Sequence, residues 1–291
     1  MHANILHNGD LIPNDRHTAS VGQVGLLNGW GVFSTIRVLD GVLFAWERHW
    51  ARMARDAAYM KVPMPPSGDA LRADLERLVQ ANAAAHATLR VVVVRNKGGL
   101  FQAPHLERDY DVVAYTVDLH DWGVSARLGV QENGRFAANP MSGLKLTSWS
   151  QNLAMLESAQ ARAFDEVVLL NERGEVSECT SANIFAVRGA RVVTPPLSSG
   201  CLPGVTRQVL LEEIAVEGVT LAEETLTLDD LYQADGVFLT SSTRELLPVA
   251  SIEGRATGRQ DTVRARLHEA FRAYMRRYAD AVRASRAQPR V

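Results

Sequence analysis

The fold class follows from residues 167–193, which read VVLLNERGEVSECTSANIFAVRGARVV. This stretch holds short apolar runs at 167–170, 184–187 and 192–193, and the turn Glu172-Arg173-Gly174 follows the first of them. Apolar runs this short, bounded by turn residues, predict β-strands joined by hairpins. The regular alternation of strands and helices that a parallel α/β sheet needs is missing, so we expect an α+β fold.

The flanking sequence continues this mixture of short strands and helices. Near the N-terminus, Asn8-Gly9-Asp10 is a strong turn signal for a β-hairpin. Further strands are predicted at 32–38, 42–46, 91–94, 112–117 and 127–136. Helices are predicted at 48–60, at 69–82 after a cap at Ser67 or Asp69, at 150–164, at 206–216 and at 263–278.

A polar segment divides the chain into two halves. It begins with Asp118 and includes His120, Asp121 and Gly123, and it is followed by the strand predicted from Arg127. We therefore expect a small N-terminal α+β domain at 1–117, an interdomain linker at 118–126 and a larger C-terminal domain at 127–291.

Composition excludes several classes of function. With 46% hydrophobic residues, 22% charged residues and a formal net charge of -2, the chain has no electrostatic reason to bind nucleic acid or an anionic membrane. No apolar run reaches the ~18 residues that span a bilayer, and no secretory signal is visible. The only cysteines, Cys179 and Cys201, favour a reducing, cytoplasmic setting. The histidines are scattered, so we expect no metal site.

Lysine is rare in this chain. Of the 31 lysines and arginines, only Lys61, Lys97 and Lys145 are lysines. Arginine keeps its proton, whereas a lysine amine can condense with an aldehyde. Lys61 suits a helix end and Lys97 a polar turn, and drift explains most such cases. Lys145 differs because it stands between Gly143-Leu144 and a predicted helix, which makes it the candidate nucleophile.

Two further features suit a phosphorylated cofactor. Glu178 follows Val176-Ser177 on a predicted strand, and a buried carboxylate there would need a cationic partner such as a protonated ring nitrogen. A solvated glutamate on an edge strand is the alternative that spacing alone favours. Pro203-Gly204 precedes a helix whose N-terminus, with Thr206, could receive an anion. The hydroxyl-rich run 240–243 could add donors, although both features also occur at ordinary helix starts and turns.

The ordered set of these segments resembles the class IV aminotransferases. Lys145 is followed in turn by Glu178 to Phe185, by Leu202 to Arg207 and by Leu239 to Glu245 with Pro248. The resemblance begins at Gly31 to Arg37 and Phe44 to Met53, so it covers most of the chain. The family includes branched-chain aminotransferases, D-amino acid aminotransferases and aminodeoxychorismate lyase.

The resemblance implies a fold, a cofactor and a set of roles. The fold would be a small α/β sandwich plus a larger pseudo-barrel β domain, with pyridoxal 5'-phosphate at their interface in a homodimer. An amino acid and a 2-oxo acid would be the substrates. Lys145 would be the Schiff-base lysine and Glu178 the partner of the pyridine nitrogen. The phosphate would be bound by Arg52, Val205, Thr206, Ser241 and Ser242, and Phe33 would line the substrate pocket.

The substrate is less well defined by the resemblance. Ser34 stands where aminotransferases usually carry glutamate and the lyase carries threonine, and Glu178-Cys179 also resembles the lyase. Arg244-Glu245 with Pro248 resembles the aminotransferases instead. Arg95 and Lys97 are the candidates to bind the substrate carboxylate, because Leu100 stands where the lyase would have arginine. We favour an aminotransferase for apolar, branched-chain amino acids, with D-amino acid transamination, the lyase reaction and a non-catalytic binding module as alternatives.

Overall fold

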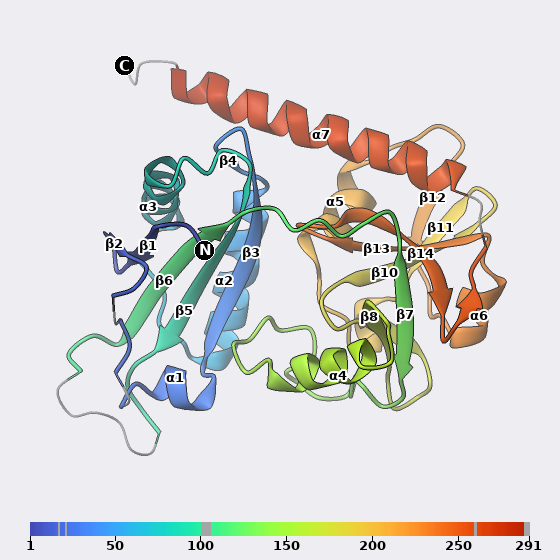
Figure 1. Ribbon diagram of the computed structural model, residues 1–291, viewed down its shortest axis with the longest axis horizontal. Helices are drawn as coiled ribbons and strands as arrows, with labels where there is room; N and C mark the ends of the chain where they lie inside the picture. Colours follow the sequence, from blue (N-terminus) through green and yellow to red (C-terminus); the bar gives the residue numbers. More distant parts are fainter. Residues whose placement is uncertain (17, 21, 100–105, 259–260, 288–291) are drawn as a thin grey trace. The chain divides into compact units, whose positions relative to one another are not determined.

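The computed structural model describes residues 1–291 apart from 17, 21, 100–105, 259–260 and 288–291 (Figure 1). It contains two compact units, and neither is one continuous piece of chain. The first consists of Met1–His120, Lys145–Trp149 and Met275–Val291, and the second of Asp121–Leu144 and Ser150–Tyr274. The predicted linker 118–126 includes the first change of unit, after His120. The segment Lys145–Trp149 returns to the first unit, which the predicted division into three consecutive ranges did not include.

A six-stranded antiparallel sheet forms the centre of the first unit. The strand order is β2-β1-β6-β5-β3-β4. The strands are β1 Asn4–His7, β2 Asp10–Pro13, β3 Gly31–Leu39, β4 Val42–Leu43, β5 Ala87–Arg95 and β6 Tyr110–Val117. Helix α2, Trp46–Met60, packs on β3, and helix α3, Gly68–Ala81, packs on β1 and β6. The apolar core of this unit lies between these helices and the sheet.

The beginning of α2 corrects one prediction. A strand was expected over 42–46, but β4 ends at Leu43 and α2 starts at Trp46. The buried positions explain this result, because Trp46, His49 and Met53 follow helical spacing rather than the alternation of a strand. At the start of α3, the Ser67 side chain accepts a hydrogen bond from the Ala70 backbone at 3.3 Å, so the predicted serine cap is confirmed.

The second unit contains a nine-stranded mixed sheet. Its main path is β12-β11-β10-β13-β14-β7-β8-β9, and β15 pairs with β14. The strands are β7 Ala126–Gln131, β8 Glu166–Leu170, β9 Val176–Cys179, β10 Asn183–Arg188, β11 Arg191–Thr194, β12 Thr220–Glu223, β13 Gly236–Ser241, β14 Glu245–Ile252 and β15 Arg255–Ala256. The pairs β7 with β8, β7 with β14 and β11 with β12 are parallel, and the other neighbours are antiparallel.

Short helices connect these strands. They are α4 Ser150–Gln160, the 3-10 turn η1 Leu197–Ser199, α5 Val205–Glu213 and α6 Leu228–Gln233. The strand predicted to reach residue 136 ends at Gln131, because Asn133 adopts a positive φ of 53° in an Asn-Gly turn. In the first unit, the five-residue helix α1, Val24–Asn28, was not predicted.

The C-terminal helix α7 runs from Thr262 to Ala287. Its residues up to Tyr274 belong to the second unit and those from Met275 onward to the first. Within the described part of the chain, no helix is both long and apolar enough to cross a membrane.

Candidate active site

Lys145 is attached to the first unit through its backbone. Its N–H donates to the Asp56 carboxylate on α2 at 3.0 Å, and its carbonyl accepts from the Phe33 N–H on β3 at 3.2 Å. The next residue, Leu146, forms a β-bridge with Val32. These contacts hold the Lys145 Nζ 4.4 Å from the centre of the Phe33 ring. The predicted nucleophile and the predicted pocket aromatic are therefore in contact.

Arg52 lies on the buried side of α2, beside the same strand. Its guanidinium Nη2 donates to the Ser34 hydroxyl at 2.9 Å, and Ser34 follows Phe33 on β3. Burial, together with the positive charges of Arg52 and Lys145, lowers the pKa of His49 well below its ordinary value. Arg52 and Lys145 thus act electrostatically on one buried imidazole. Within the first unit, Lys145 therefore contacts Phe33, and Arg52 bonds to the next residue of the strand, Ser34.

Arg90 is a neighbour of this site that the sequence did not single out. Its guanidinium carbon lies 4.0 Å from the Phe33 ring centre, so it contacts the same aromatic ring as Lys145. On β5 it pairs with Thr35, two residues beyond Phe33 on the same face of the sheet. Among the described residues, no hydrogen bond or ion pair is recorded for its side chain. Its place depends on the register between β3 and β5, and among 28 arginines nothing in the sequence singled it out.

Arg95 and Lys97 use their donors locally. Arg95 donates from Nε to the Lys97 carbonyl and from Nη1 to the Lys61 carbonyl, both at 2.6 Å, and stacks on Trp30. The Lys97 ammonium pairs with Asp109 at 3.0 Å and with the Glu107 carbonyl. Their role as ligands of the substrate carboxylate stays a prediction. Leu100 lies outside the described residues.

Glu178 is buried on β9, with only 6% of its surface exposed. Its Oε1 pairs with Arg135, whose Nε and Nη2 lie 3.0 and 2.9 Å away, and its Oε2 accepts from the Leu202 N–H at 3.0 Å. The interpretation as a solvated edge-strand glutamate is therefore wrong. Arg135 already supplies the positive charge that the buried Glu178 carboxylate requires. The burial of Glu178 is therefore not by itself evidence for a bound ring nitrogen. Oε2 still has a lone pair to offer one.

The start of α5 has the form of an anion site. Its N-cap is Gly204, which makes no side-chain cap, and the first two helical residues, Val205 and Thr206, are buried. A Cβ on Gly204 would lie 2.0 Å from the Asn183 Oδ1, so only glycine allows this approach. The helix thus presents backbone N–H groups that no side chain caps, which is what an anion needs.

The end of β13 lies beside this helix start. Asn183 on β10 contacts Gly204 and pairs in register with Thr240 on β13, so the strand end and α5 share a neighbour. The Thr240 hydroxyl is buried and has no hydrogen-bond partner among the described residues. The Ser241 hydroxyl accepts from the Arg244 backbone at 3.1 Å, and Ser242 is half-buried in the same turn. The second unit therefore places the start of α5 near the end of β13, whereas Arg52, the other predicted phosphate donor, belongs to the first unit.

A buried ion pair between Arg244 and Glu166 supports the turn that holds Ser242 and the turn that follows Glu178. Arg244 donates from Nη2 to Glu166 at 3.1 Å and lies 3.7 Å from the Trp122 ring centre. Glu166 also accepts from the Thr180 N–H at 3.2 Å and from the Ser181 hydroxyl at 2.5 Å. The pair therefore joins the turn after Glu178 to the turn that holds Ser242. Sequence reasoning missed it, because Glu166 begins a strand whose other residues are apolar.

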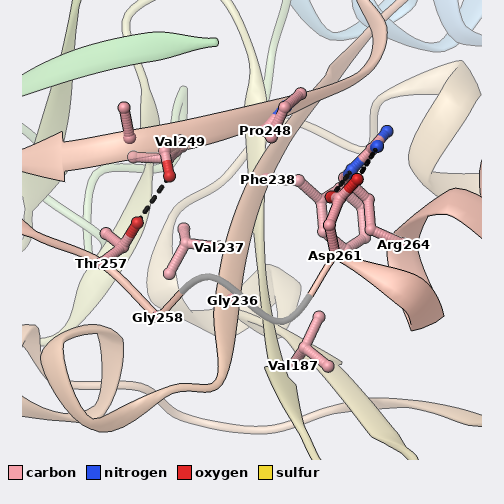
Figure 2. Close-up of a pocket in the computed structure, with 11 residues that line it drawn as sticks. Val187, Gly236, Val237, Phe238, Pro248, Val249, Thr257, Gly258, Asp261 and Arg264 are labelled. Carbon is pink, nitrogen blue, oxygen red and sulfur yellow. Dashed lines mark hydrogen bonds and ion pairs between the residues drawn. The ribbon is translucent and has the colours of Figure 1, made fainter.

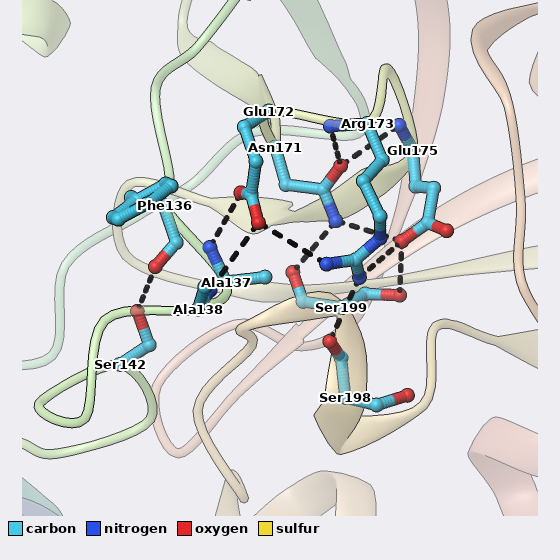
Figure 3. A network of polar contacts seen from close by, with 10 residues as sticks. All are labelled: Phe136, Ala137, Ala138, Ser142, Asn171, Glu172, Arg173, Glu175, Ser198 and Ser199. Carbon is cyan, nitrogen blue, oxygen red and sulfur yellow. Dashed lines mark hydrogen bonds and ion pairs between the residues drawn. The ribbon is translucent and has the colours of Figure 1, made fainter.

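A more exposed network holds the loop that precedes Lys145 (Figure 3). The Glu172 carboxylate accepts from the backbone N–H groups of Ala137 at 2.7 Å and Ala138 at 3.3 Å. Its neighbour Arg173 donates to the Ser198 carbonyl at 2.9 Å, in the η1 turn. The turn between β8 and β9 thus anchors both this loop and the segment that leads to α5.

A cavity of about 350 Å³ on the second unit contains none of the predicted site residues. Figure 2 shows its apolar lining, including Val237, Phe238 and Val249, with Asp261 and Arg264 on one side. These two charged side chains pair with each other at 2.6 Å. The cavity therefore offers neither an amine nor an uncompensated charge, and it is not the candidate active site.

Comparison with known proteins identifies the family. The model for "Amino-transferase class IV" matches residues 31–252, which include Lys145, Arg52, Glu178 and the turn at Ser242. The chain belongs to the class IV aminotransferases. This aminotransferase is 30% identical to the D-alanine aminotransferase of Bacillus licheniformis over 87% of its own length and 90% of the relative's. It is 26% identical to the branched-chain-amino-acid aminotransferase of Escherichia coli over 92% and 91% of the two chains.

Solved structures extend the comparison to the fold. The branched-chain amino acid aminotransferase of T.th., solved with pyridoxamine 5'-phosphate, has a TM-score of 0.86 with this class IV enzyme. The two are 25% identical, and the match covers 94% of each chain. The α+β class and the two-domain fold with a pseudo-barrel β domain that the resemblance implied are therefore confirmed.

Proposed function

We propose that this class IV aminotransferase carries pyridoxal 5'-phosphate on Lys145 and transfers the amino group of an apolar amino acid, most simply a branched-chain one, to a 2-oxo acid. The observation that carries the proposal is the placement of Lys145. Both of its backbone polar groups are bound, to Asp56 and to Phe33, so its amine has a defined position against the Phe33 ring. A flexible surface lysine would have no such support.

The donor set fits the chemistry of this cofactor. Class IV aminotransferases use pyridoxal phosphate, and the T.th. relative was solved with its amine form. When bound, the cofactor supplies an aldehyde that condenses with amines and a ring that withdraws electrons from the bond being broken. Its phosphate needs donors: the proposed one in the first unit is the buried Arg52 guanidinium, and those in the second unit are at the uncapped start of α5, Val205 and Thr206. Ser241 and Ser242 complete the proposed phosphate site.

Glu178 is the proposed partner of the ring nitrogen. Arg135 places a positive charge beside this buried carboxylate, and the Leu202 N–H orients Oε2. An ionised carboxylate favours a protonated ring nitrogen, because the two charges attract each other at short range. The Lys145 amine, once released by an incoming amino group, is the proposed general acid and base that moves the proton.

Arg90 is the proposed group for the substrate carboxylate. It contacts the same Phe33 ring as Lys145 and has no carboxylate partner among the described residues. Guanidinium groups bind carboxylates through paired hydrogen bonds. The Phe33 ring, which both cations contact, is the proposed apolar wall beside the side chain of the substrate. Relatives named as branched-chain aminotransferases support an apolar substrate.

A lysine-specific experiment tests the cofactor assignment. The purified enzyme is expected to absorb in the near-ultraviolet to blue region, and borohydride is expected to bleach this band and label one lysine. Lys145→Arg keeps the charge but cannot condense with an aldehyde, so it should lose the band and at least a thousandfold in turnover, roughly the loss when a covalent nucleophile is removed. Lys61→Arg is the matched control and should keep both. Wild-type turnover in the Lys145 variant would refute the proposal.

A substrate panel tests the reaction. L-leucine, D-alanine and aminodeoxychorismate separate branched-chain transamination from the D-amino acid and lyase alternatives. The D-alanine aminotransferase relative favours the second reaction, and Ser34 at the threonine position of the lyase favours the third. Absence of the absorbance band and of turnover with all three would favour a non-catalytic binding module.

Replacing Arg90 tests the carboxylate site. Arg90→Gln should raise the KM for the preferred amino acid by roughly tenfold to a hundredfold, because a charged hydrogen bond is lost. The absorbance band should remain. Arg276→Gln, on the exposed side of α7, is the control. An unchanged KM in the Arg90 variant would refute this assignment and favour Arg95 or Lys97 as the ligand of the substrate carboxylate.

We also propose a cytoplasmic homodimer. Both cysteines are free and buried, which suits a reducing compartment. Burial also raises the pKa of the Cys201 thiol to about 12, which suits an unreactive thiol. Light scattering of the purified enzyme at micromolar concentration is expected to give twice the chain mass of 31.9 kDa. A single-chain mass would refute the dimer.

A further inference from the structure

Three side chains of the first unit form a continuous buried chain of hydrogen bonds. The Arg52 Nη2 lies 2.9 Å from the Ser34 hydroxyl oxygen, and that oxygen lies 2.7 Å from the His49 Nδ1. Ser34 and His49 have no exposed surface, and Arg52 is 7% exposed. Ser34 comes from β3, whereas the other two lie on successive turns of α2.

The direction of each hydrogen bond follows from the donors available. Arg52 can only donate, so the Ser34 oxygen must accept from it. The single hydroxyl hydrogen of Ser34 then needs an acceptor, and His49 Nδ1 is the only one recorded for it among the described residues. His49 is therefore the neutral tautomer with its proton on Nε2. Burial and the neighbouring charges of Arg52 and Lys145 lower the pKa of His49, which agrees with a neutral ring.

The second ring nitrogen of His49, Nε2, indicates why a histidine occupies this position. Nε2 is buried and has no hydrogen-bond partner among the described residues. A buried N–H without a partner costs free energy that an apolar residue of similar size at this position would not incur. Histidine at position 49 is therefore explained by its use of Nδ1, the acceptor that receives the Ser34 hydroxyl.

We propose that Ser34 and His49 are positioning residues that orient the Arg52 guanidinium toward the phosphate of the cofactor. This inference rests on the proposed function, in which Arg52 binds that phosphate. His49 directs the Ser34 hydrogen away from Arg52, so a lone pair of Ser34 faces the guanidinium and holds one of its N–H groups. Because a hydroxyl carries no charge, its hydrogen bond aligns Arg52 without adding a negative charge beside the guanidinium.

Cofactor binding to the apo-enzyme tests this proposal without an activity measurement. The dissociation constant of pyridoxal phosphate is measured by titration, and the bound phosphate is observed by phosphorus NMR. Ser34→Ala should weaken binding on the order of tenfold and shift the phosphate resonance, because Arg52 loses the hydrogen bond that orients its guanidinium. The absorbance band from Lys145 should still form at saturating cofactor, since the lysine is not altered.

Two variants of His49 separate positioning from packing. His49→Asn keeps an acceptor close to the position of Nδ1 and should retain the wild-type affinity and resonance. His49→Leu has similar bulk but no acceptor and should resemble Ser34→Ala. Equal affinity and an unshifted resonance in Ser34→Ala and His49→Leu would overturn the proposal. Equal weakening in the Asn and Leu variants would also overturn it, because packing alone would then explain the loss.

The wild-type titration distinguishes the two levels of inference. If the wild-type enzyme binds pyridoxal phosphate and forms the borohydride-sensitive band while the variants are unchanged, only the positioning role fails. If the wild-type enzyme neither binds the cofactor nor forms the band, the proposed function itself fails, and the positioning role fails with it.

Discussion

Replacing Arg244 by methionine should destabilise the second unit more than any surface substitution. The Arg244 side chain is 4% exposed and its ion-pair partner Glu166 is 1% exposed. Arg244 also donates to the Ser181 hydroxyl at 3.0 Å and stacks on Trp122. Methionine fills most of the same volume and can still pack on the tryptophan, so the substitution removes mainly the charge and its hydrogen bonds.

The magnitude follows from the charge that remains. Removing one partner of a buried ion pair costs about 3–5 kcal/mol, because the other charge stays buried without compensation. Glu166 keeps hydrogen bonds from Thr180 and Ser181, which soften this penalty. We therefore expect a loss near the lower limit, about 3 kcal/mol in the free energy of unfolding.

The double variant Glu166→Gln with Arg244→Met supplies the control. It removes both charges, so it should recover more than half of the loss, as a buried pair replaced by neutral groups often does. Urea unfolding of wild type, single and double variants, followed by tryptophan fluorescence, measures the differences. A loss below about 1 kcal/mol in the single variant, or a double variant no more stable than the single one, would refute the reasoning.

Two other substitutions test features of the second unit. Gly204→Ala places a Cβ against the Asn183 Oδ1 and should weaken cofactor binding on the order of tenfold; the double variant with Asn183→Ala should restore it, and failure to do so would exclude the clash as the cause. Burial raises the pKa of Glu245, but hydrogen bonds from His268 and Arg272 outweigh it and lower that pKa to about 2. Because the pKa is lowered on folding, this carboxylate contributes stability above pH 4.5, roughly 3 kcal/mol, which is lost as the pH falls toward 2. Urea unfolding of wild type and Glu245→Gln should therefore differ at neutral pH and converge at acid pH, and a difference independent of pH would contradict this assignment.

Local signals in the sequence predicted much of the secondary structure. The Asn-Gly turn between β1 and β2 and the Ser67 cap of α3 depend on neighbouring residues only, so they can be read from the chain. The start of α2 was misjudged, because Val42 to Trp46 is as apolar as a strand and only tertiary burial distinguishes the two. The five-residue helix α1 has too few residues for a periodic pattern.

The candidate site was predictable in part. The rarity of lysine left three candidates, and the family resemblance singled out Lys145 and supplied Arg52. The contacts of Glu178 with Arg135 and of Phe33 with Arg90 join positions 43 and 57 residues apart, and no local pattern encodes such pairs. They arise from strand register and loop placement, which the fold alone determines.

The route of the chain between the two units has a practical consequence. The chain changes unit after residues 120, 144, 149 and 274, so no single cut separates one unit from the other. A fragment that ends at His120 would lack Lys145 and its backbone bonds to Phe33 and Asp56. It would also lack the Tyr278 hydroxyl that donates to Glu47 at 2.6 Å. Attempts to express either unit alone, or to split this enzyme for complementation, should therefore yield unstable pieces rather than two autonomous domains.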